Sequence, residues 1–316
     1  MSIQVTGLRG VGAALPTPYR FGRVDFDAFE GLCHRLIERG IDTLVPCGTT
    51  GEAALLTMAE QRKLIERAVA ASRGRVPVIA GAGSNNTATA VELAVSAEAG
   101  GASALLCVTP AYLKPTQAGV IAHFDAIHSA VGIPMILYDV PSRTACPLSD
   151  LSVKRLAQLP RVIGLKDATA DVPRVRRLRR RLGPEFLLLS GDDATQSAFR
   201  KAGGDGCISV TANVVPALCA ALHRAHDCKH EDEIERLDRI LRPLHAALFV
   251  EPNPIPLKRA LHRLRLIQDG LRLPLTPLSP TADRHLAAVL ERILPAEQIE
   301  AARFAAAHPL VAPRAA

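Results

Sequence analysis

The feature that most constrains the fold is an alternation of short apolar segments with longer amphipathic ones. Segments such as ASALLCV (102–108) and PMILYDV (134–140) are apolar almost throughout, so both faces of each strand are expected to be buried. Parallel strands covered by helices have this pattern. The predicted strands are 11–18, 43–48, 76–82, 102–108, 134–139, 162–166, 186–191 and 206–210. The predicted helices between them are 27–39, 58–72, 87–99, 117–130, 149–158, 172–182 and 194–202.

Eight strands with a helix between each pair predict an α/β fold, a (β/α)8 TIM barrel. A doubly wound parallel sheet is the alternative, but that fold has a glycine-rich turn after its first strand. Here the first strand leads into LPTPYRFG (15–22), which lacks that pattern. The sequence therefore favours the barrel.

The residues after the eighth strand show no strand pattern. Helices are predicted there at 215–228, 231–249, 255–265, 281–294 and 297–307. We therefore expect a barrel over residues 1–228 and a C-terminal helical extension, packed on the barrel, over 229–316. Residues 309–316 are expected to fray.

Composition excludes several classes of protein. Hydrophobic residues make up 48% and charged residues 22%, which is enough apolar surface to exclude disorder for most of the chain. No apolar run is long enough to cross a membrane, and the first residues lack the basic-then-apolar pattern of a secretory leader. The seven cysteines are scattered and odd in number. They are typical of reduced thiols, so we predict a cytoplasmic protein.

The net charge of +7 raises the possibility of nucleic-acid binding. The chain has no Trp and is only 3% aromatic, so it lacks platforms on which bases could stack. Much of the positive charge lies in RVRRLRRR (174–181), which we interpret as a solvated helix face with Asp171 as its N-cap and Pro173 in its first turn. No nucleic-acid or membrane partner is expected.

One cluster resembles a metal site. His223, His226 and His230 share a helix face, with Cys228 nearby, so a zinc site is geometrically possible. No second group of thiols or carboxylates completes it, and a polar helix end explains the same residues. We therefore predict no metal.

A lysine closes the sixth predicted strand, IGLK (163–166), at the end of the barrel where active sites lie. Burial disfavours the ammonium form, and Schiff-base formation requires a neutral amine. A lysine that only clears the rim into water is the alternative. Lys166 is therefore a candidate nucleophile.

Other polar residues follow the same strand ends. Tyr112 and Tyr138 are two of three tyrosines, and a phenol near an imine can transfer protons through a hydroxyl such as that of Thr50. Tyrosines at a barrel rim with satisfied hydroxyls are the alternative. Arg143 could bind a carboxylate, and the turn 48–51 offers N–H groups to an anion. A surface arginine and an ordinary turn are the competing interpretations.

Six motifs together resemble one family. They are GTTGE (48–52), YDVPSRT (138–144), GLKDAT (164–169), SGDD (190–193), GCISVTAN (206–213) and EPNPIPLK (251–258). In this order, over about residues 8–292, they resemble the dihydrodipicolinate synthase family of the N-acetylneuraminate lyase superfamily of class I aldolases. The PSRT element is similar to the synthases in particular.

The resemblance implies the reaction and its central residues. The expected activity is condensation of pyruvate with L-aspartate-4-semialdehyde, which begins lysine and diaminopimelate synthesis. Lys166 would form the imine with pyruvate, and Tyr138 would transfer protons beside it. Thr50 would connect Tyr138 to Tyr112, which would reach in from a neighbouring subunit. Arg143 would orient the carboxylate of the aldehyde substrate.

The resemblance also implies residues that bind substrate. Thr49 and Thr50 would hold the pyruvate carboxylate, Gly191 and Ile208 would line the pocket, and Asn253 would lie near it. No metal or organic cofactor is expected, and the family is typically a homotetramer.

Two departures from the family pattern are visible. Asp139 stands where Asn is common, and this carboxylate is expected near the imine, where it could tune proton transfer or the choice of aldehyde. The polar and aromatic groups of the lysine feedback site are replaced by Ala53, Met58, Gln61, Thr89 and Ala111, although Asn85 is kept.

Two other functions stay open. A related pyruvate aldolase or dehydratase acting on a sugar acid or another aldehyde would keep Lys166, Tyr138 and Thr50 but would not need Arg143 as a carboxylate clamp. A basic interaction protein on a barrel scaffold would have an inert Lys166 and salt-sensitive binding to nucleic acid.

Overall fold

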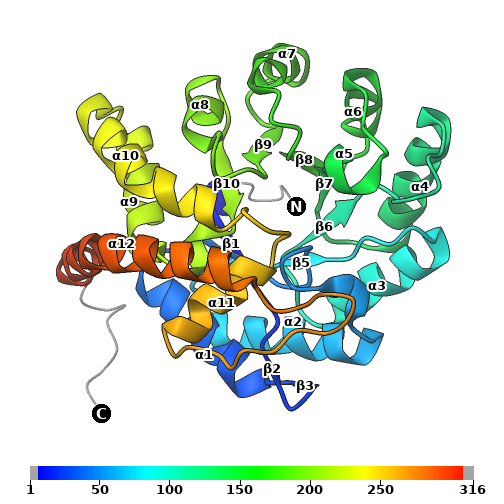
Figure 1. Ribbon diagram of the computed structural model, residues 1–316. Helices are drawn as coiled ribbons and strands as arrows, with labels where there is room; N and C mark the ends of the chain where they lie inside the picture. Colours follow the sequence, from blue (N-terminus) through cyan, green and yellow to red (C-terminus); the bar gives the residue numbers. More distant parts are fainter. Residues whose placement is uncertain (1–5, 309–316) are drawn as a thin grey trace.

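Eight parallel strands form the wall of a barrel in the computed structural model, which describes residues 6–308 (Figure 1). They are β1 (Gly10–Ala14), β4 (Thr43–Val45), β5 (Ile79–Gly81), β6 (Ala104–Val108), β7 (Met135–Asp139), β8 (Val162–Asp167), β9 (Leu187–Ser190) and β10 (Gly206–Ser209). The strands pair in the order β4-β1-β10-β9-β8-β7-β6-β5, and a bridge between Leu44 and Val78 joins the two ends. The predicted (β/α)8 barrel is confirmed.

Helices connect successive strands on the outside of the barrel. They are α1 (Phe26–Glu38), α2 (Met58–Ser72), α3 (Thr87–Ala99), α4 (Gln117–Ala130), α6 (Asp150–Leu156), α7 (Val172–Leu182) and α8 (Gln196–Lys201). Thr57 and Glu60 form a reciprocal capping box at the start of α2, and Asn86 and Thr116 accept N–H groups at the starts of α3 and α4. These local caps explain why the predicted starts lie close to the observed ones.

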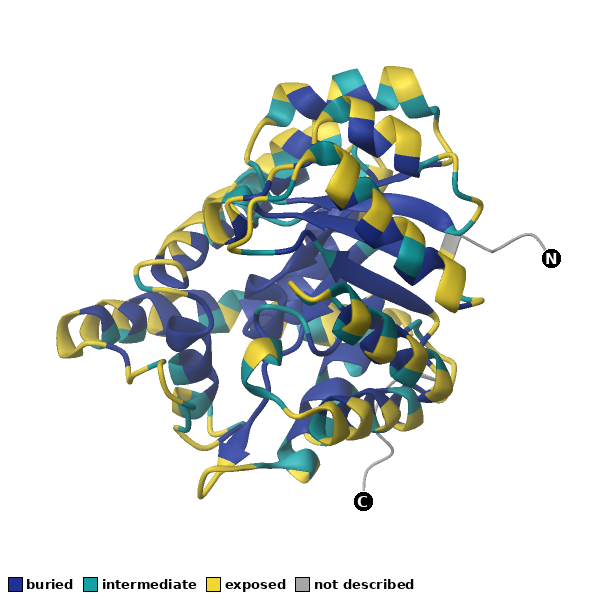
Figure 2. Ribbon diagram, turned by 90° about the vertical axis from the view of Figure 1, so that its right-hand side faces the viewer, coloured by how far each residue is buried: buried dark blue, intermediate teal, exposed yellow. Residues whose placement is uncertain are grey.

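Two apolar cores lie on the two faces of the strands. Leu106 and Ile136 belong to the core inside the barrel, whereas the adjacent Leu105 and Leu137 pack toward the helices. Figure 2 shows that the barrel strands are mostly buried, whereas buried and exposed residues alternate along most of the surrounding helices. Both strand faces are therefore apolar, which is the pattern visible in the sequence.

Up to residue 308, four α-helices follow β10: α9 (Pro216–Asp227), α10 (Glu231–Ala247), α11 (Ile255–Arg263) and α12 (Pro280–Ala307). The prediction of two helices at 281–294 and 297–307 is wrong, because α12 continues through Pro295. Beyond this proline, the buried Glu297 accepts the N–H groups of Ala217 and Leu218 at the start of α9 and pairs with Arg39. These contacts hold the helix where proline removes a backbone hydrogen bond.

The boundary at residue 228 stays a prediction, and the fraying expected at 309–316 falls outside the described residues. The first strand ends at Ala14 rather than at residue 18, since Pro16 and Pro18 have no N–H to donate to a neighbouring strand. A hairpin of β2 (Tyr19–Arg20) and β3 (Arg23–Val24), not predicted, follows. Short elements complete the chain: η1 (Thr6–Leu8), η2 (Ala53–Leu55), α5 (Pro141–Thr144) and η3 (Thr211–Asn213).

The basic helix α7 is only partly a solvated face. Arg174 is buried rather than solvated, which corrects the sequence-based interpretation. Asp171 stands at the start of α7, but its side chain makes no capping hydrogen bond and pairs with Arg177 instead. The Asp171 carboxylate therefore binds an arginine side chain of α7 and does not cap the backbone N–H groups at the start of this helix.

Two of the histidines considered as metal ligands lie against α8, whereas His230 stands at the start of α10 and does not share their helix, contrary to the expectation. His223 Nε2 is 3.0 Å from the side-chain oxygen of Gln196, and His226 Nε2 is 3.0 Å from the hydroxyl of Ser197. Within residues 6–308, no group of three His, Cys, Asp or Glu side chains is arranged to hold a metal ion. Over the same span, every helix is too short or too polar to cross a membrane.

Candidate active site

The carboxyl ends of β7 and β8 bring Tyr138 and Lys166 side by side. The two residues are paired in register, and Lys166 Nζ lies 4.4 Å from the centroid of the Tyr138 ring. Both residues are only 6% exposed. Their neighbours Leu137 and Leu165 face the helices, so the alternation of a strand turns Tyr138 and Lys166 toward the barrel interior.

The surroundings of Lys166 leave its amine available. Among the described residues no carboxylate pairs with it, and the adjacent Asp167 faces the other way and pairs with Arg174. Gly191 makes room for the side chain, because a Cβ at this position would lie 3.0 Å from Lys166 Cε. Ile208 is buried in the interior core, as expected for a residue that lines the site. The amine is therefore not held in an ion pair and can reach a carbonyl carbon.

The loop after β4 carries Thr49 and Thr50. The Thr50 hydroxyl accepts a hydrogen bond from Asn253 Nδ2 at 3.0 Å, and both residues are buried. The Gly51 carbonyl accepts a hydrogen bond from the Thr17 hydroxyl, which ties the loop to the segment after β1. Among the described residues, no protein group accepts the N–H of Thr49 or Thr50. These two N–H groups can therefore bind an anion such as a carboxylate.

Arg143 lies on α5, directly after β7. Its Nη2 donates to the backbone carbonyl of Asn253 at 3.2 Å, and the residue is exposed at the mouth of the barrel. The structure therefore brings Arg143, Asn253 and Thr50 into one chain of contacts. An arginine placed in this way still has donors left for a carboxylate.

Tyr112 does not join the other candidates within this chain. It is 86% exposed and adopts a left-handed backbone conformation with φ of 74°. Its N–H donates to the Thr144 carbonyl, which fixes the backbone while the ring projects outward. A contribution of Tyr112 to the site of a neighbouring subunit stays a prediction.

Asp139 does not face the amine, contrary to the expectation from its place beside Tyr138. It is fully buried on the outer face of the barrel, where its Oδ2 accepts from Arg174 at 2.7 Å and from the N–H of Leu148. Arg174 also pairs with Asp167 and Asp150. Burial raises the pKa of Asp139 although Arg174 opposes that shift. The alternation of a strand is a signal that could have predicted this outward direction.

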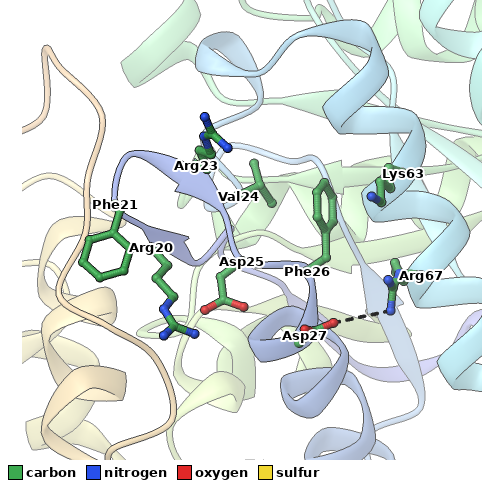
Figure 3. A pocket seen from close by; sticks show the side chains of 9 residues that line it. All are labelled: Arg20, Phe21, Arg23, Val24, Asp25, Phe26, Asp27, Lys63 and Arg67. Atoms are coloured by element: carbon green, nitrogen blue, oxygen red, sulfur yellow. Dashed lines mark ion pairs between the residues drawn. The ribbon is translucent and has the colours of Figure 1, made fainter.

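A hollow of about 610 Å³ lies elsewhere, between the hairpin β2–β3 and helix α2 (Figure 3). Lys63 Nζ lies over the ring of Phe26, and Arg67 pairs with Asp27 and Glu30. None of its lining residues belongs to the site described above. It lacks a lysine beside a tyrosine at a strand end, so the barrel mouth remains the candidate site.

Sequence reasoning missed one ion pair close to the site. Glu52 and Lys258 each end a motif, GTTGE and EPNPIPLK, and their side chains pair at 2.6 Å. Two charged residues at motif ends were the available signal. No spacing in the sequence indicates that residues so far apart meet.

Comparison with known proteins gives a consistent result. A family model described as the dihydrodipicolinate synthetase family matches residues 7–293. The 4-hydroxy-tetrahydrodipicolinate synthase of Parvibaculum lavamentivorans is 50% identical over 277 residues, which cover 87% of this chain and 95% of the relative. The corresponding synthase of Rhodospirillum centenum is 48% identical over 85% of this chain and 92% of its own length.

A solved structure agrees with these relatives. The chloride-inhibited dihydrodipicolinate synthase of Acinetobacter baumannii, complexed with pyruvate, is 41% identical and superposes with a TM-score of 0.87. The match covers 90% of this chain and 98% of that one. The similarity therefore extends over the barrel and most of the helical extension.

Proposed function

This chain belongs to the dihydrodipicolinate synthetase family, and from that premise we propose that it condenses pyruvate with L-aspartate-4-semialdehyde to 4-hydroxy-tetrahydrodipicolinate. It is accordingly a lyase of the class I aldolase type. The observation that carries the proposal is a buried lysine, Lys166, beside Tyr138 at the mouth of the barrel, held by no carboxylate among the described residues. Schiff-base chemistry needs such an amine.

The proposed first stage is imine formation. The Lys166 amine attacks C2 of pyruvate, and loss of water gives the imine. Removal of a proton from C3 then gives the enamine. Tyr138 is the proton carrier, Thr50 passes protons to it, and the N–H groups of Thr49 and Thr50 bind the pyruvate carboxylate. No metal or organic cofactor takes part in these steps.

The proposed second stage joins the two substrates. The enamine carbon attacks the aldehyde carbon of aspartate semialdehyde, and the aldehyde oxygen becomes the hydroxyl group. The substrate amino group then attacks C2 and displaces Lys166, which restores the free amine. Arg143 holds the carboxylate of the aldehyde substrate, and Gly191, Ile208 and Asn253 shape the pocket.

We also propose that the protein works as a homo-oligomer, a tetramer, in the cytoplasm. The large exposure of Tyr112 supports the oligomer, because its ring projects away from its own site. In this arrangement Tyr112 completes the proton relay of a neighbouring subunit by reaching Thr50.

The test is a pyruvate-dependent assay over a panel of aldehydes, read by mass spectrometry of the products. Aspartate semialdehyde should be consumed with pyruvate in a one-to-one ratio. Preference for a sugar-acid aldehyde would overturn the proposed substrate, and would identify the chain as a related pyruvate aldolase.

A further inference from the structure

The ion pair between Glu52 and Lys258 is completely enclosed. Lys258 Nζ lies 2.6 Å from Glu52 Oε1, and each side chain is 1% exposed. Glu52 belongs to the loop after β4, whereas Lys258 lies on α11 of the helical extension. The pair therefore joins the barrel mouth to a segment that is remote in the sequence.

An aromatic ring and a second cation surround this pair. The centroid of the Tyr19 ring lies 4.1 Å from Lys258 Nζ and 4.6 Å from Cζ of the Arg272 guanidinium. Arg272 also donates to the carbonyl of Leu55 and pairs with Glu60. The hairpin, the loop after β4 and the helical extension are thus tied together at one point.

The same two segments meet a second time at the candidate site. Asn253, five residues before Lys258, donates to the Thr50 hydroxyl, which lies two residues before Glu52. Thr50 is therefore held both by its own hydrogen bond and by the ion pair that follows it. Movement at either contact would change where its hydroxyl points.

The backbone conformation of Glu52 also depends on its ion pair with Lys258. Glu52 adopts a left-handed conformation, with φ of 56° and ψ of 36°, that a residue other than glycine adopts only at a cost. A buried carboxylate also needs a partner, which Lys258 supplies. The pair keeps the chain in this conformation as it passes from Thr50 into η2.

We infer that Glu52 and Lys258 are positioning residues that hold the Thr50 hydroxyl in the geometry for proton transfer. The inference rests on the proposed function, because it concerns the proton relay of that reaction. Neither residue is required to touch the substrate. They act by holding the backbone conformation of the loop that contains Thr50.

The test compares turnover with the number of competent sites. Borohydride reduction with labelled pyruvate counts the sites that form the imine, and kcat is expressed per trapped site. Loss of folded protein lowers the total rate and the number of trapped sites in proportion, so kcat per trapped site does not change. A misplaced Thr50 lowers kcat per trapped site. Glu52→Gln keeps the size of the side chain and removes its charge, and Thr50→Val removes the hydroxyl.

Glu52→Gln should lower kcat per trapped site about 10- to 100-fold, because small displacements of a reacting group have effects of this size. When Glu52→Gln is added to Thr50→Val, kcat per trapped site should fall by less than about threefold relative to Thr50→Val alone, because both changes act on the same hydroxyl. Glu297→Gln is the matched control, because Glu297 is also a buried carboxylate paired with a cation. It should lower the melting temperature and leave kcat per trapped site unchanged.

If Glu52→Gln leaves too little folded protein, Glu52→Gln/Lys258→Met replaces it in the same comparison, since no single charge then stays buried. Its kcat per trapped site should fall by a similar factor. A loss below about twofold, or an equal loss with and without the Thr50 hydroxyl, would overturn the inference alone. Wild-type protein that traps no pyruvate would overturn the proposed function, and the inference with it.

Discussion

The two faces of strands β7 and β8 carry polar groups that differ in their charge and in their ion-pair partners. On the inner face, Lys166 lies over the ring of Tyr138 and, among the described residues, pairs with no carboxylate. On the outer face, one residue further along each strand, Asp139 and Asp167 share the guanidinium of Arg174. Adjacent residues of one strand therefore meet different chemical surroundings within a few ångströms.

The difference separates a reactive group from a structural one. A charge whose partners are all supplied by the protein stabilises the fold, and its removal leaves another charge buried. An amine without such partners is available to a substrate. The predictions below test this distinction from the largest expected effect to the smallest.

Lys166→Ala should abolish imine formation and lower turnover by at least about ten-thousand-fold, because the nucleophile is lost. Borohydride reduction with pyruvate, followed by peptide mass spectrometry, should find the added mass on the Lys166 peptide of the wild type only. An adduct of equal yield in the variant would place the imine on another lysine, and the inner face would lose its assigned role.

Arg174→Met should instead lower the free energy of unfolding by about 3–5 kcal/mol, because Asp139 and Asp167 are left buried without their shared cation. Urea unfolding measures this change, and kcat per trapped site should stay within about threefold of the wild type. Arg176→Met, at an exposed position of the same helix, is the control and should change stability little. If Arg174→Met destroys turnover at each trapped site, the outer face is not purely structural.

Arg143→Ala should lower kcat/KM for aspartate semialdehyde about 30- to 1,000-fold through loss of a charge-assisted contact worth about 2–4 kcal/mol. Pyruvate imine formation at Lys166 should persist. Steady-state kinetics with each substrate varied in turn checks both statements, with the exposed Arg176→Ala as control. Kinetics like those of the wild type would favour a sugar-acid aldehyde as the substrate.

Asp139→Asn should have a small, pH-dependent effect. Burial raises the pKa of Asp139, so the folded protein binds this proton more tightly than the unfolded chain does. That stability is present at low pH and is lost as the pH rises from about 4, the ordinary Asp value, through the raised pKa.

The amide can keep both hydrogen bonds that Asp139 Oδ2 accepts, and its NH₂ replaces Oδ1, which has no partner among the described residues. Relative to the wild type, the variant should therefore be more stable at neutral pH than at low pH, where both side chains are uncharged. Urea unfolding at several pH values measures the difference. A large loss of turnover would show that Asp139 acts on the imine after all.

The smallest expected effect is inhibition by L-lysine, whose three charged groups need partners as Asp139 and Arg174 do. Met58 and Ala111 offer none, and the Gln61 amide already donates to the carbonyl of Ala53. Half-inhibition should therefore require more than about 1 mM lysine. Initial rates at saturating pyruvate, with a lysine-regulated synthase assayed in parallel, measure it. Half-inhibition at micromolar lysine would show that other groups supply the partners.

The sequence by itself determined the barrel. The eight strands, the helices between them and the position of Lys166 and Tyr138 at strand ends follow from local patterns of short apolar runs and longer amphipathic segments. These signals lie within a few residues of one another, so they do not depend on how the chain closes. The same alternation predicts the outward direction of Asp139 once Tyr138 is known to face inward.

The tertiary structure alone decided which distant groups meet. Glu52 with Lys258, Thr50 with Asn253 and Glu297 with the start of α9 are contacts between segments separated by long stretches of chain. Arg174 shows the same limit, because its sequence of neighbouring arginines is typical of a solvated face and only closure of the barrel buries it against three carboxylates. Local composition sets which side chains are charged, but the packing of α7 and α11 on the strands determines which of those charges lose contact with water and must find a partner.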